Sequence, residues 1–276
     1  MLRTIAALAR STHPGPSLAV SAIAVGLGIG IGLEPWRLVL LGLAVLANQA
    51  SVGLSNDWID ADRDRAVGRT DKPVALGQVS TRLARNAAIG AAVASIVLTL
   101  PLGWPATLAN TVFIVSAWSY NLALKSTAFS VVPYIVSFGL LPMIVTLSSP
   151  VPLLASGWSV LAGALLGVSA HFANVLPDLE DDRATGIRGL GHRVGRRTSG
   201  LVIAGALAAA SASIVLGPGP AAAYQYVGLS VSLVLAATCA VLVLTGRSSR
   251  LIFRLIIAGA LIDVALLALS GSRLLA

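Results

Sequence analysis

The feature that most constrains this chain is a series of apolar runs, each long enough to cross a lipid bilayer. A transmembrane helix needs about 20 predominantly apolar residues. Hydrophobic residues make up 56% of the 276 residues, charged residues only 11%, and the mean hydropathy is +0.87. These values lie outside the range of soluble domains. We therefore predict an all-α, polytopic integral membrane protein that occupies the lipid bilayer as a single domain over residues 1–276.

Proline, glycine and clusters of charged residues separate these runs, because each of them interrupts an apolar helix. The run lengths and breaks predict about nine transmembrane helices, with ends uncertain by a few residues. They are expected near residues 17–33, 38–55, 86–100, 104–122, 129–147, 153–175, 201–216, 221–244 and 251–269.

The basic residues predict the orientation of these helices. With the N-terminus in the cytoplasm, seventeen of the nineteen lysines and arginines fall in cytoplasmic segments, and only Arg37 and Arg273 fall outside. This distribution follows the positive-inside rule. The net charge of +8 is then mainly a signal of topology, and we expect no nucleic-acid partner.

One stretch is unusually acidic for such an apolar chain. Residues 56–68 read NDWIDADRDRAVG, and Asp57, Asp60 and Asp64 are spaced three and four residues apart. On a helix these side chains share one face, where like charges repel one another. A divalent cation offsets that repulsion, and Mg²⁺ suits a site with few protein carboxylates whose other ligands are water and phosphate oxygens.

The same stretch occurs again 118 residues later, where residues 174–186 read NVLPDLEDDRATG. Six of thirteen positions are identical, in a chain with only eleven acidic residues. Four predicted helices separate the copies, so the two halves have the same orientation and form a parallel internal repeat. We expect both copies to face a central cavity at the cytoplasmic membrane surface, Asp178 and Asp182 in the second matching Asp60 and Asp64 in the first.

Two facing carboxylate clusters predict a substrate as well as a metal. Mg²⁺ bridges carboxylates to the oxygens of a diphosphate, and the surrounding bilayer offers an apolar space for a long tail. An isoprenyl diphosphate has both parts. Charge balance with neighbouring arginines is the simpler explanation for Asp62 and Asp181, which lie on other helical faces.

The two motifs resemble those of the UbiA superfamily of intramembrane prenyltransferases. Asn56, Asp57, Asp60 and Asp64 occupy the named positions of its NDxxDxxxD motif, and Asp178 and Asp182 those of its DxxxD motif. Arg69, Lys72-Pro73 and Gly77 resemble the continuation of the first motif. One departure concerns the family's Tyr-xxx-Lys pattern, because Tyr120 and Lys125 are one residue further apart here.

The resemblance implies that Mg²⁺ assists ionisation of the diphosphate and that the allylic cation is captured by a lipophilic or aromatic acceptor. The implied metal ligands are Asp57, Asp60, Asp64, Asp178 and Asp182. Residues expected to stabilise charge on the leaving diphosphate, or to act beside it, are Arg69, Lys72, Tyr120 and Lys125. Asn56, Asn174, His171 and Arg188 are expected to bind or orient the substrate.

Two other functions fit the same motifs. A terpene cyclase of the same superfamily would use identical metal chemistry and quench the cation internally, without an acceptor. A cation-coupled transporter would use the carboxylates as ion sites, but such sites usually lie near the bilayer midplane at broken helices, whereas these motifs extend into arginine-rich loops.

Overall fold

The protein is a bundle of long helices. A computed structural model describes residues 2–176, 179, 186, 188–245 and 249–276. Its helices are α1 (Leu2–Arg10), α2 (Pro14–Gly30), α3 (Pro35–Ile59), α4 (Ala61–Ala66), α5 (Thr81–Thr99), η1 (Leu100–Leu102), α6 (Trp104–Leu122), η2 (Leu124–Ser126), α7 (Val132–Leu147), α8 (Gly157–Val175), α10 (Leu190–Leu216), α11 (Ala223–Leu244), α12 (Ser249–Leu269) and η3 (Gly271–Leu274).

The all-α prediction is confirmed, since no strand occurs in the part of the chain that the structure describes. Each of the nine predicted ranges lies on one long helix, and α6 has the predicted bounds. Five helices have the length and hydropathy of membrane spans, and three further apolar helices are shorter, so a total of nine spans stays a prediction. The short helices α1 and α4 were not expected from the sequence.

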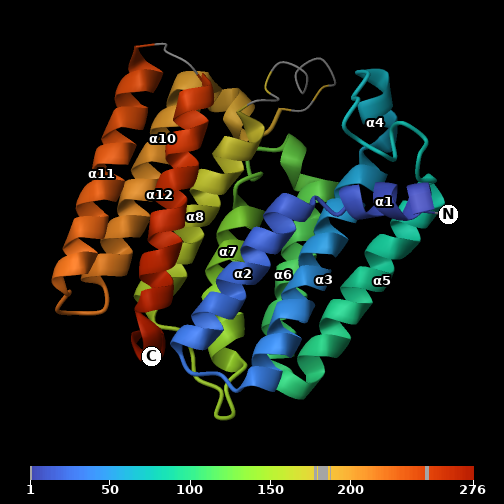
Figure 1. Ribbon diagram of the computed structural model, residues 1–276. Coiled ribbons are helices and arrows are strands. Elements are labelled where there is room, and N and C mark those ends of the chain that lie inside the picture. The colour runs from blue at the N-terminus through green and yellow to red at the C-terminus, as the bar shows by residue number, and fades with distance from the viewer. Residues whose placement is uncertain (1, 177–178, 180–185, 187, 246–248) are drawn as a thin grey trace.

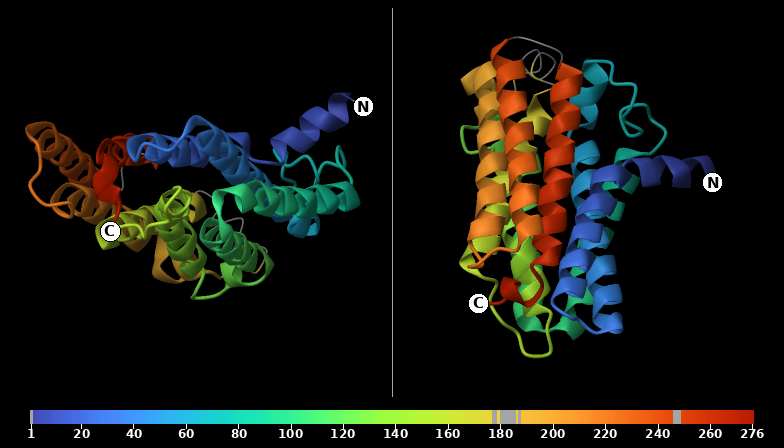
Figure 2. Two further views of the ribbon diagram at one scale, coloured as in Figure 1. Left: turned by 90° about the horizontal axis from the view of Figure 1, so that it is seen from below. Right: turned by 60° about the vertical axis from the view of Figure 1, so that its left-hand side comes forward.

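Seven of the long helices form a closed ring. Going round it, α2 contacts α3, then α6, α7, α8, α10 and α12 follow, and α12 returns to α2. Helix α5 packs on α3, and α11 packs on α10 and α12. Figures 1 and 2 show these helices running roughly alongside one another, with α1 lying across them at the end where α4 is found. We call this end of the bundle, where α3 and α8 finish, the motif end.

The internal repeat is visible in the way the two motif-bearing helices pack. Helix α3 leads through the first motif into α5, which packs against it, and α8 leads through the second into α10, which packs against α8. The last glycine of each motif copy has a left-handed backbone, with φ of 69° at Gly68 and 82° at Gly186. Glycine adopts this conformation without steric cost, which accounts for its presence at both positions.

Helices α7 and α8 approach so closely that their backbones touch. Gly163 and Gly167 lie one turn apart on α8, and a β-carbon on either would clash with a carbonyl oxygen of α7, that of Phe138 or of Tyr134. Small residues four apart permit this kind of contact between membrane helices. Pro142 of α7 has no backbone N–H to bond the Phe138 carbonyl, so that oxygen faces the α-carbon of Gly163 instead.

We predict that Gly167→Ala separates α7 from α8 and lowers the free energy of unfolding by about 1–3 kcal/mol, as overpacking does. The matched control is Gly205→Ala in α10, where a β-carbon would meet no atom within 4 Å. That variant should be as stable as the natural protein or slightly more so, because alanine favours helix. Thermal unfolding in detergent measures both, and equal stability of the two variants would contradict the packing argument.

Candidate functional site

Three aspartates of the first motif lie buried at the motif end. Asp57 is 1% exposed, and Asp60 and Asp64 are each 4% exposed. They do not share one continuous helix, because α3 ends at Ile59 and α4 begins at Ala61. The backbone N–H of Asp60 still donates to the carbonyl of Asn56, and that of Asp64 to the carbonyl of Asp60. These i to i−4 hydrogen bonds preserve the helical spacing of the three side chains. The predicted clustering of these carboxylates is therefore retained across a break in the helix.

Two side chains contact the same oxygen of Asp57. Its Oδ1 accepts from Lys72 Nζ at 2.7 Å and lies 2.9 Å from His13 Nε2, which is itself 3.2 Å from Lys72 Nζ. Lys72 comes from the loop after α4, and His13 from the junction of α1 and α2. The other oxygen of Asp57, Oδ2, is buried and has no hydrogen-bond partner among the described residues.

Asp60 is held by cations from two different elements. Arg63 of α4 donates to Oδ2 at 2.8 Å, and Lys125 of η2 pairs with Oδ1. Asn56 joins this group to the one around Asp57, because its Nδ2 donates to Asp60 Oδ2 at 3.0 Å while its Oδ1 accepts from Lys72 at 3.1 Å. The contacts thus form one continuous network from His13 to Lys125.

Asp64 is the least compensated of the three carboxylates. Arg63 is 3.9 Å from its Oδ1, and its Oδ2 is buried without a partner in the described residues. Burial raises the pKa of Asp64 above its ordinary value, and the Asp60 carboxylate adds to this, while Lys72 opposes it. Burial lowers the pKa of Lys125, against the attraction of Asp60. Asp64 therefore has an unmet requirement for a positive partner.

Nearby, Arg69 makes two hydrogen bonds to Asp71, both of 2.8 Å. These bonds hold the pKa of Asp71 down at about 2. The carboxylate of Asp71 is 61% exposed and the Arg69 side chain 26% exposed, so the pair lies at the edge of the site with its carboxylate toward solvent. Arg69 is thus close to the aspartate network but belongs to its rim.

The unpartnered oxygens of Asp57 and Asp64 are the feature that fits a metal ion. Buried carboxylate oxygens normally have a partner, and a hard divalent cation supplies one. Within the described ranges, however, no three His, Cys, Asp or Glu side chains come together as a complete site. The first motif therefore offers part of a ligand set. Asp178 and Asp182, the predicted ligands of the second motif, lie outside the described residues.

The described start of the second motif contacts a cluster of aromatic rings. Asn174 Nδ2 donates to Tyr134 Oη at 3.3 Å. The Tyr134 ring lies 5.2 Å from that of Tyr120 and 5.1 Å from that of His171. His171 is fully buried, with Nε2 3.2 Å from Ser130 Oγ and Nδ1 without a partner among the described residues. Tyr120, His171 and Asn174, three of the predicted site residues, are thus brought together.

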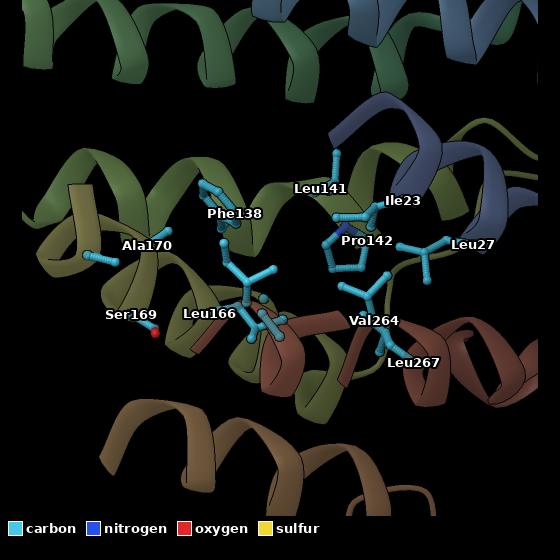
Figure 3. Close-up of a pocket in the computed structure, with 14 residues that line it drawn as sticks. Ile23, Leu27, Phe138, Leu141, Pro142, Leu166, Ser169, Ala170, Val264 and Leu267 are labelled. Atoms are coloured by element: carbon cyan, nitrogen blue, oxygen red, sulfur yellow. The ribbon is translucent and has the colours of Figure 1, made fainter. Parts of the chain in front are cut away.

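A cavity of about 230 Å³ opens inside the ring beside this cluster. Its walls come from α2, α7, α8 and α12, and they are apolar except for the hydroxyl of Ser169. Phe138 lines the cavity and also stacks on Tyr134, at 6.2 Å between ring centroids. Figure 3 shows Phe138 and Ala170 at one end of the lining residues, and Leu27 and Leu267 at the other. The aromatic cluster therefore connects the start of the second motif to an apolar chamber.

The remaining predicted residue, Arg188, is exposed and its carbonyl accepts a bond from Arg193. Three residues of the site were not predicted, namely His13, Arg63 and Tyr134. A single histidine, an arginine within an acidic motif and a tyrosine in an apolar run carry no periodic signal. Only the folded chain brings them to the motif.

Comparison with known proteins agrees with the predicted resemblance. The profile of the UbiA prenyltransferase family matches residues 16–267. Comparison with the sequences of curated proteins gave no match.

Among solved structures, a UbiA homologue from Archaeoglobus fulgidus bound to GPP and Mg²⁺ is 16% identical with a TM-score of 0.73, covering 96% of this chain and 99% of that one. A UbiA homologue from Aeropyrum pernix is 20% identical with a TM-score of 0.70, covering 91% and 94%. A structure of digeranylgeranylglyceryl phosphate synthase is 14% identical with a TM-score of 0.68, covering 98% and 99%.

We predict that Lys72→Met lowers the free energy of unfolding by about 3–5 kcal/mol, because it leaves the Asp57 carboxylate buried without its cation. Adding Asp57→Asn should recover much of the loss, since no unpaired charge remains. The control is Asp62→Asn, whose carboxylate is 96% exposed and should matter by at most about 1 kcal/mol. Denaturant titration in detergent gives all three values, and similar losses for Lys72→Met and Asp62→Asn would contradict the prediction.

Proposed function

Since the chain belongs to the UbiA prenyltransferase family, and is thus an integral membrane protein with an activity of the prenyltransferase type, we propose that it ionises an isoprenyl diphosphate with the help of Mg²⁺. It then transfers the prenyl group to a lipophilic or aromatic acceptor. The observation that carries this proposal is the juxtaposition of two buried, unpartnered carboxylate oxygens, on Asp57 and Asp64, with the cations Lys72, Arg63 and Lys125.

The diphosphate belongs at the motif end in this proposal. Asp57, Asp60 and Asp64 would hold Mg²⁺ from the first motif, with Asp178 and Asp182 doing so from the second. Bound Mg²⁺ supplies a Lewis acid for the diphosphate oxygens. Lys72 and Lys125 lie among the carboxylates as preorganised donors, and such donors favour a reaction in which negative charge develops on a leaving group.

The prenyl tail belongs in the apolar cavity. Phe138 lines this chamber and stacks on Tyr134, whose hydroxyl accepts from Asn174 at the start of the second motif. Aromatic faces attract cations, so this position suits an allylic cation as its bond to the diphosphate breaks. Asn174 and Tyr120 orient Tyr134 through its hydroxyl and ring.

A second function is favoured by one observation, the lining of the cavity. The described lining residues include a single hydroxyl, that of Ser169, and no charged group. A terpene cyclase needs no polar group for an acceptor, so this lining suits internal capture of the cation as well as transfer. Acceptor dependence of the reaction separates the two functions.

We also propose that residues 1–276 act as a single transmembrane domain with the N-terminus and the motif end in the cytoplasm. The basic residues of the loops support this orientation. Arg63, Lys72 and Lys125 are among them and lie at the same end of the bundle, beside the carboxylates.

We predict that the detergent-purified protein releases diphosphate from geranyl, farnesyl or geranylgeranyl diphosphate only when Mg²⁺ is present. EDTA should abolish release, and Asp60→Ala should lower it by at least about 100-fold, because a preorganised group at the reacting centre is lost. Asp62→Ala is the matched control, since Asp62 pairs only with Arg65 in the described structure.

The same assay is run with and without a panel of aromatic and lipid acceptors. Release that requires an acceptor supports the transferase. Mg²⁺-dependent release without one, with a cyclic hydrocarbon or alcohol as product, supports the cyclase. Full activity of Asp60→Ala would overturn the assignment of this carboxylate to the metal site.

A further inference from the structure

His13 is a residue in an unusual backbone conformation that contacts the site from outside both motifs. Its φ of 53° is the only positive value among the described residues other than glycine. Such a conformation is uncommon for a residue with a side chain and persists where the surroundings enforce it. His13 precedes α2, yet its side chain makes no capping bond to that helix. The ring reaches Asp57 instead.

The contact to Asp57 leaves the two oxygens of the carboxylate in different situations. Oδ1 lies within hydrogen-bond distance of both His13 and Lys72, whereas Oδ2 is buried and unpartnered in the described structure. With the imidazole proton on Nε2, His13 and Lys72 both donate to Oδ1, and two donors that converge on one oxygen fix the rotation of the carboxylate. The free oxygen is then presented in a single direction, which is what a metal ligand requires.

The position of His13 is itself fixed by its neighbours. Gly53 of α3 lies under Thr12, and a β-carbon at Gly53 would come within 2.7 Å of the Thr12 carbonyl. Helix α1 holds the segment from the other side, because the buried Ala7 packs with Val74 and Val79 of the loop between α4 and α5. The chain can cross α3 this closely only because a glycine is there.

We propose that His13 is a positioning residue for the site: in the tautomer with its proton on Nε2, it donates to Asp57 Oδ1 beside Lys72 and so orients Oδ2 toward the metal–diphosphate complex. The inference rests on the proposed function and adds to it a residue outside both motifs. His13 acts through Asp57 and does not touch the reacting atoms. Partners that orient a metal ligand typically change metal affinity or activity by about 10- to 100-fold when removed.

The test measures Mg²⁺-dependent binding of an unreactive thiolo analogue of geranyl diphosphate, with tryptophan fluorescence as the readout. Trp58 adjoins Asp57 and packs edge-on against Trp118, so it reports on this site. His13→Ala should raise the Mg²⁺ concentration for half-maximal binding by about 10- to 100-fold. His13→Gln, whose amide can donate in place of Nε2, should restore most of the affinity.

Two further variants distinguish the contribution of the His13 ring from that of its backbone conformation and from that of α1. His13→Gly accommodates the positive φ but has no donor, so it should bind as weakly as His13→Ala. Arg10→Ala removes only the exposed hydrogen bond of α1 to Gln78. The buried packing of Ala7 still holds the segment that carries His13, so the Mg²⁺ requirement of this variant should match that of the natural protein. Thermal unfolding confirms that each variant is folded.

The outcomes distinguish this inference from the function on which it rests. If the natural protein does not bind the analogue with Mg²⁺, the proposed function is overturned, and the inference with it. If the natural protein binds and His13→Ala binds equally well, the inference alone is overturned. It is also overturned if His13→Gln binds as weakly as His13→Ala, or if Arg10→Ala weakens binding to the same extent.

Discussion

Burying an ionised carboxylate is costly unless a cation lies beside it, and this constraint organises the motif end of the bundle. Asp57, Asp60 and Asp64 meet Lys72, Arg63 and Lys125 there. The cations come from the loop after α4, from α4 itself and from η2. Segments far apart in the sequence therefore meet at one place because each contributes to a single charge network.

The parallel repeat gives the site a second side of different character. The first motif is surrounded by ion pairs, whereas the described start of the second meets aromatic rings, with Asn174 bonded to Tyr134. Close α7–α8 packing through Gly163 and Gly167 holds Phe138 in the wall of the apolar cavity, with Tyr134 stacked on it. The described parts of the two related sequences therefore lie in different surroundings.

The sequence allowed the long helices to be predicted because each contains an unbroken apolar run. Helix α10 was placed too late, near residue 201 instead of Leu190, because its first turns are polar and bend at Gly195, whose φ is 78°. The aspartates were predicted from their spacing, which is repeated in the second motif, and Lys72 and Lys125 from the resemblance to the UbiA superfamily. His13 and Tyr134 were not, because their roles depend on tertiary contacts that leave no periodic trace.

The ion-pair network also determines what a measured substrate affinity would mean. In the proposed function, a diphosphate that reaches this site would meet lysines already engaged by carboxylates, so each new contact to a lysine would replace an existing one. Binding would then be an exchange of partners, in which the aspartates would hold the metal and the lysines and Arg63 would turn to phosphate oxygens. The measured affinity would reflect the difference in free energy between two nearly matched sets of ion pairs. Stronger ion pairs in the protein without substrate would therefore weaken substrate binding.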